Sequence, residues 1–169
     1  MRDPRLEPYR APAIAFAAYL VLQAASAAAL FALKLGGAEG VRAFYLGSEE
    51  RFTAAKSLAG ILEVAVPHLV AIPLVLFAAA HVVGFARALP VAAHRVLVAA
   101  SFGAALAGIL AGFGVRWVGP ELAWLKIVSF AALEVALLAW AGLLGAVFLP
   151  RRAAAPAGAS RRAAGEVAR

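Results

Sequence analysis

The sequence predicts an all-α integral membrane protein, a four-helix up-down bundle with both termini on the cytoplasmic side. Of its 169 residues, 64% are hydrophobic and 15% are charged, whereas a soluble domain contains about 45–50% and about 25%. Four apolar stretches each exceed the roughly 20 residues with which a helix crosses the hydrocarbon core. Helices are expected because they satisfy their own backbone polar groups in lipid, and the alternation of a barrel strand is absent.

The four stretches run over about residues 11–33, 61–85, 91–115 and 122–149. Leu89-Pro90 and Gly119-Pro120 mark short turns between the last three, and short connections make neighbouring helices antiparallel. We therefore expect residues 1–150 to form one transmembrane domain. Residues 151–169 lack apolar periodicity and are expected to be a basic, disordered cytoplasmic tail.

The first stretch has an alternative interpretation as a signal peptide. Small residues of the kind that precede a cleavage site occur at Ala24-Ala25-Ser26-Ala27. The apolar run continues well past them and exceeds a typical signal-peptide core, which favours a membrane-spanning helix.

Lysine and arginine are distributed unequally between the two ends of the predicted bundle. Ten lie at the N-terminus, in the turn after the second helix and in the tail, against five at the other end. The positive-inside rule then places both termini in the cytoplasm of a multi-pass protein of the bacterial inner (plasma) membrane. We expect the net charge of +7 to serve this topology rather than nucleic-acid binding, with membrane lipids and other membrane subunits as partners.

The segment 35–60 is the sizeable loop outside the membrane in this topology. Ser48 followed by Glu49 and Glu50 is typical of a helix N-cap with acidic residues in the first turn. We therefore expect a short interfacial helix from Glu49 to about Ser57 in this first outer loop.

Small residues recur every four positions along the third stretch, at Ala100, Ala104, Gly108 and Gly112. Such a stripe lets helix backbones approach closely, either in a dimer or within one bundle, and packing within the bundle is the favoured interpretation.

Ionisable side chains inside a membrane are costly, so each is a candidate functional residue. The second stretch carries Glu63, His68 and His81. The two histidines are 13 residues apart, which is about 20 Å along a helix but leaves them about 140° apart around it. Pro73 lies between them and is expected to bend or re-register the helix if both face inward. Glu63 and His81 share a face.

His94, one turn into the third stretch, is expected at the same depth as His81, so that the two form a candidate pair for one haem or metal ion. The alternative for His94 is an interfacial side chain beside Arg95. For His68 and His81 the alternative is a hydrogen bond to a backbone carbonyl freed by a proline, or a polar contact to a neighbouring helix.

Glu134 lies at the middle of the fourth stretch, where a carboxylate is disfavoured unless it is paired. Gln23, Tyr19 or a helix of another subunit are its candidate partners. Glu134 and Glu63 are the candidate proton-relay residues, and Glu134 also suits a quinol site. The alternative is a protonated glutamate that forms a hydrogen bond across helices. Lys126 is expected to extend outward to the membrane surface.

The histidine-bearing segments Val66-Pro67-His68 and Ala80-His81-Val82 resemble those of small membrane-bound b-type cytochromes. The resemblance covers the second and third helices. It implies that His68, His81 and His94 bind a cofactor, with His68 and His81 as ligands of haem b iron, and that electrons pass between a quinone and a partner. The first and fourth helices lack histidine, so this chain alone supplies at most one bis-histidine haem.

Three functions fit these observations. The first is a membrane-embedded electron-transfer subunit that holds b-type haem or a quinol site through histidines of the second and third helices. The second is a non-catalytic accessory or assembly subunit of a larger membrane complex. The third is a small proton or metal transporter, for which four helices without an inverted repeat leave little room. Cysteine is absent and no hydrolase or phosphoryl-transfer motif occurs, so no catalytic residue is assigned.

Overall fold

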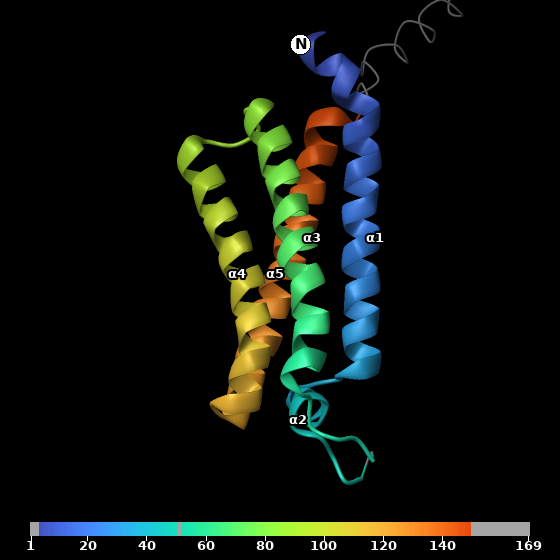
Figure 1. Cartoon of the computed structure of the whole chain (residues 1–169). Helices are drawn as coiled ribbons and strands as arrows, with labels where there is room; N and C mark the ends of the chain where they lie inside the picture. The colour runs from blue at the N-terminus through green and yellow to red at the C-terminus, as the bar shows by residue number, and fades with distance from the viewer. Residues whose placement is uncertain (1–3, 51, 150–169) are drawn as a thin grey trace, which may run out of the picture.

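The computed structural model describes residues 4–50 and 52–149, so the predicted tail at 151–169 lies outside the described part (Figure 1). Four helices in that part are long and apolar enough to span a membrane, which confirms the all-α integral membrane fold. The elements in order are η1 (Pro4–Tyr9), α1 (Arg10–Lys34), α2 (Ala38–Leu46), α3 (Leu58–Phe85), α4 (Val91–Trp117), η2 (Pro120–Leu122) and α5 (Ala123–Phe148).

The bundle is built around α5, which packs along α1 on one side and along α4 on the other. Helix α3 packs on α4 and, less extensively, on α5, whereas its backbone lies farther from that of α1. The largest fully buried side chains include Leu20, Leu76, Trp140 and Leu144, which lie on α1, α3 and α5. The start of α1 and the end of α5 lie at one end of the bundle, here called the terminal end, and α2 lies at the other, the α2 end (Figure 1).

The short helix in the loop between α1 and α3 lies at Ala38–Leu46, so its predicted place at Glu49–Ser57 is wrong. Ser48 and Thr53 instead pair their backbones across a turn, with N–O distances of 2.9 and 3.0 Å. The N-cap is Ser57, whose side chain accepts a hydrogen bond from the Gly60 N–H at 3.1 Å as α3 begins. The acidic residues after Ser48 predicted a helix start there. The apolar side chains that anchor a helix to the bundle, Val41 and Tyr45, lie earlier in the loop.

Helix α2 is held by apolar side chains that it buries against the α2 end of the bundle. Val41 is fully buried and Tyr45 nearly so, and this burial raises the pKa of the Tyr45 hydroxyl. Polar contacts reinforce the docking, because Arg42 Nε donates to the Pro120 carbonyl at 3.1 Å and Arg116 Nε to the Lys56 carbonyl at 2.9 Å. The buried residues of this cluster are Val41, Tyr45, Ile61, Val115 and Ala123.

Two of the small residues in the stripe on α4, Gly108 and Gly112, pack against other helices of the same bundle. This is the interpretation that the sequence favoured. A Cβ on Gly108 would lie 3.2 Å from Ser129 Oγ, and one on Gly112 would lie 2.7 Å from Tyr45 Oη and 2.9 Å from Tyr45 Cζ. Helix α4 therefore meets α5 at Gly108 and α2 at Gly112.

We expect Gly112→Ala to lower the free energy of unfolding by about 1–3 kcal/mol, because the added methyl overlaps the buried Tyr45 ring. Thermal unfolding in detergent measures the loss. The same substitution in a Tyr45→Leu background should cost much less, since the ring has gone. Equal losses in both backgrounds would contradict this packing.

Candidate functional site

A cavity of about 300 Å³ lies between the four long helices, and each of them contributes to its wall. We call it the polar cavity, because polar side chains from three helices meet there within a lining that is otherwise mostly apolar. The polar side chains in its wall are those of Gln23, His68, Lys126, Ser129 and Glu134.

Three of these side chains lie close to the middle of the membrane span. Gln23, His68 and Glu134 are each ten or eleven residues from the α2 end of their helix, which is about 15–17 Å along the axis. Half of a hydrocarbon core of about 30 Å is about 15 Å. The polar cavity is therefore placed at a depth where polar groups are costly and mark function.

The His68 ring is oriented by its own helix. Nδ1 lies 2.6 Å from the Val64 carbonyl oxygen one turn earlier, and since a carbonyl only accepts, Nδ1 carries the proton. In the neutral ring Nε2 is then an acceptor. The histidine does bond a backbone carbonyl, but Val64 is not a carbonyl freed by a proline, because Pro67 and Pro73 free those of Glu63 and Leu69. Nε2 remains for a ligand.

Lys126 does not extend outward as expected. Its Nζ donates a hydrogen bond to the Gly108 carbonyl of α4 at 2.7 Å, and the residue lines the polar cavity. Gly108 lies where α4 meets α5, since a Cβ there would be 3.2 Å from Ser129 Oγ, so its carbonyl is within reach of Lys126 on the same helix α5. An ammonium has three N–H donors, and this hydrogen bond uses one of them.

Glu134 is half-buried in the cavity wall, eight residues beyond Lys126 on α5, which is about 12 Å along the helix. Among the described residues no ion pair joins Glu134 to a base. Of its predicted partners, Gln23 lines the same cavity, whereas Tyr19 is 70% exposed on α1. A cationic donor and a carboxyl group thus face one cavity without neutralising each other directly.

The other predicted site residues lie outside the polar cavity. His81 is exposed and stacks on Phe77 at 5.8 Å between ring centroids, and Glu63 is also exposed. His94 places Nε2 3.0 Å from the Ala80 carbonyl and packs edge-on against Trp140. Helix α3 remains one helix through its prolines, and only His68 of its two histidines lines the cavity. Within residues 4–50 and 52–149, no group of three or more metal-ligating side chains occurs.

The polar cavity opens sideways between α1 and α3. The backbones of these two helices do not approach each other closely, and Gln23 and His68, which line the cavity from either side, are both exposed. A small molecule can therefore reach the polar groups from the side of the bundle.

The sequence interpretation missed Lys126 and Ser129 as parts of the site. The signal was their spacing, because Lys126, Ser129, Leu133 and Leu137 follow one another at three or four residues and so share a face of α5. All four line the polar cavity together with Glu134.

Comparison with known proteins gives one family. The model of Aq_1264_TM, a transmembrane helical domain, matches residues 36–154, which include α2, α3, α4 and α5. No curated protein and no solved structure matches the chain.

Proposed function

We propose that this chain, which belongs to the Aq_1264_TM family of transmembrane helical domains, binds the head group of a membrane quinone in its polar cavity as a subunit of an electron-transfer complex. The observation that carries the proposal is the combination of a lysine, a histidine and a glutamate in the wall of one cavity, with the histidine and the glutamate at mid-membrane depth.

The chemistry of the cavity suits a quinone head group. A quinone presents two carbonyl oxygens on opposite sides of a flat ring, and the Lys126 ammonium is a donor for one of them. The quinol form presents two hydroxyls instead, for which the Glu134 carboxyl and His68 Nε2 are acceptors. Binding sites for small molecules are typically apolar with a few placed polar groups, and Phe130 and Leu133 supply apolar wall.

A bound quinone would supply two-electron redox chemistry, with the electrons coming from a partner subunit. This chain's own residues would bind and orient the ring and exchange protons at Glu134 and at His68 Nε2. The isoprenoid tail would leave the cavity between α1 and α3, whose backbones do not approach each other closely.

Haem b stays a prediction of the histidine pattern, and the geometry favours the quinone part of that hypothesis. His68 is the histidine that lines the cavity, His81 faces outward beside Phe77, and His94 Nε2 is engaged by the Ala80 carbonyl. The transporter alternative uses Glu134 and the histidines, and of these His81 and His94 do not line the polar cavity.

Short-chain quinone analogues should bind the purified protein in quinone-free lipid nanodiscs, and His68→Gln should weaken binding about five- to tenfold through loss of an oriented hydrogen bond. The matched control is His81→Gln, on the other face of the same helix. Equilibrium titration measures both dissociation constants. Equal effects of the two substitutions, or no binding by the unaltered protein, would rule out this site.

We infer from the lysine and arginine distribution that both termini face the cytoplasm of the inner membrane. The chain has no cysteine, so single cysteines report topology without background. A membrane-impermeant maleimide applied to intact spheroplasts should label Thr53→Cys at the α2 end but label Pro90→Cys at the terminal end only after permeabilisation. The reverse pattern would show the opposite orientation.

A further inference from the structure

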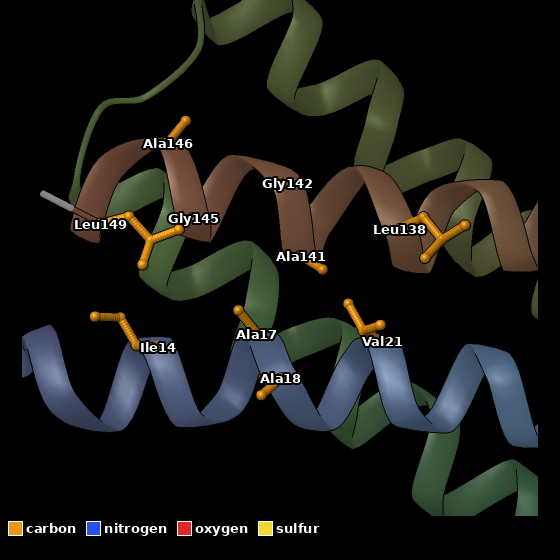
Figure 2. Close-up of a pocket in the computed structure, with 10 residues that line it drawn as sticks. All are labelled: Ile14, Ala17, Ala18, Val21, Leu138, Ala141, Gly142, Gly145, Ala146 and Leu149. Atoms are coloured by element: carbon orange, nitrogen blue, oxygen red, sulfur yellow. The ribbon is translucent and has the colours of Figure 1, made fainter. Parts of the chain in front are cut away.

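A second hollow, here called the α1–α5 groove, lies between α1 and α5 towards the terminal end and has a volume of about 710 Å³. Figure 2 shows α1 and α5 side by side, with Ile14, Ala17 and Val21 on the side of α1 that faces α5. All residues that line the groove are alanine, glycine, valine, leucine or isoleucine. It therefore offers apolar surface and no side-chain hydrogen bond, in contrast to the polar cavity.

The length of the groove matches one leaflet of a bilayer. On α5 it extends from Leu138 to Leu149, which is about 16 Å along the helix axis. One half of the hydrocarbon core is about 15 Å. The groove thus runs from the membrane surface at the terminal end to about the middle of the bilayer, the depth reached by an acyl chain.

A basic residue stands at the surface end of the groove. Arg10 precedes Ile14 by one helical turn on the same face of α1. Its contact with Glu7, at 3.6 Å, is a solvent-exposed pair of the kind that contributes little. In the sequence, Arg151 and Arg152 follow Leu149 by two and three residues. Arg10 therefore lies next to the first groove residues in the sequence, and two further arginines follow the last one.

We propose that the α1–α5 groove binds one acyl chain of an anionic phospholipid whose phosphate is held at Arg10. A second copy of the chain is the rival occupant, but a helix with its side chains is about 10–12 Å wide, and the groove lies between two helices that already pack along each other. An acyl chain is thinner and matches the leaflet depth. Because apolar burial gives no preference over bulk lipid, selectivity comes from the head group.

The chain offers a matched pair of substitutions for this groove. Gly142 lines it, and a Cβ on Gly142 would meet no atom within 4 Å, as is also true of Gly103, which is exposed on α4 outside the groove. Gly142→Leu should fill the groove without a clash, while Gly103→Leu adds the same side chain elsewhere. Melting temperatures of both variants confirm that they fold.

Native mass spectrometry from nanodiscs with equal phosphatidylglycerol and phosphatidylcholine tests the proposal. The unaltered protein and Gly103→Leu should retain one phosphatidylglycerol, and Gly142→Leu should lose it. Arg10→Gln changes a partly exposed side chain without filling the groove, and it should lower the preference for the anionic lipid about fivefold. Retention by Gly142→Leu, no preference in the unaltered protein, or a dimer that Gly142→Leu dissociates would each overturn it.

Discussion

Lys126→Met is expected to weaken quinone binding by about 10- to 100-fold. The substitution keeps most of the apolar stem but removes the ammonium donor from the wall of the polar cavity. Hydrogen bonds to charged groups contribute about 1.5–3 kcal/mol, and about 1.4 kcal/mol corresponds to a tenfold change. Titration of a short-chain quinone into protein in quinone-free nanodiscs measures the dissociation constant.

Lys34→Met is the matched control, because Lys34 is exposed at the last residue of α1. The melting temperature is a second readout, which separates a binding role from a structural one. It is needed because Lys126 also links α5 to α4 through its hydrogen bond to the Gly108 carbonyl. If this hydrogen bond were the only role of Lys126, Lys126→Met would lower the melting temperature and leave the dissociation constant of the folded protein unchanged. That result would remove Lys126 from the binding site.

Gly40→Ala is expected to lower the free energy of unfolding by about 3 kcal/mol, the upper end of typical overpacking losses. A Cβ on Gly40 would lie 1.5 Å from the Leu35 carbonyl oxygen and 2.5 Å from its carbonyl carbon. Backbone atoms cannot rotate away as a side chain can. The turn that brings them together depends on Gly36 and Gly37, whose φ angles of 67° and 155° are unfavourable for other residues.

The first turn of α2 must therefore rearrange, which pulls Val41 and Tyr45 out of the cluster at the α2 end. Thermal unfolding measures the loss, and Gly103→Ala is the control because a Cβ there would meet no atom within 4 Å. Equal melting temperatures for the two variants would show that the docking of α2 contributes nothing to stability. Quinone binding, at mid-membrane depth, should change far less than stability.

The four long helices could be predicted because insertion into a membrane depends mainly on the summed hydrophobicity of about 20 consecutive residues. That sum can be taken from the sequence without knowing which helices pack together. The position of α2 could not be predicted in the same way. Ser48, Glu49 and Glu50 have the local pattern of a helix start, but Val41 and Tyr45 bind to a surface formed by α3, α4 and α5. A tertiary contact decides where this short helix forms.

The candidate site was only partly predictable for a related reason. Gln23, His68 and Glu134 could be identified because they are polar residues within apolar stretches. Placing a polar side chain in a membrane costs free energy whichever way it faces. Whether a side chain faces inward depends on helix rotation, which separates His68 from His81 on α3. Lys126 lies near a helix end, where a lysine normally extends to the surface, but here it turns inward and donates a hydrogen bond to the Gly108 carbonyl of the neighbouring helix.

The central claim, that the polar cavity holds a quinone head group, is tested most directly by photolabelling. A quinone with a photoreactive azide on its ring is irradiated with the protein in nanodiscs, and labelled peptides are identified by mass spectrometry. We expect labels on α3 and α5 within residues 67–75 and 126–137, suppressed by excess unlabelled quinone and by Lys126→Met. Labels that gather instead on the exposed face around Phe77 and His81, and that excess quinone does not suppress, would contradict the claim.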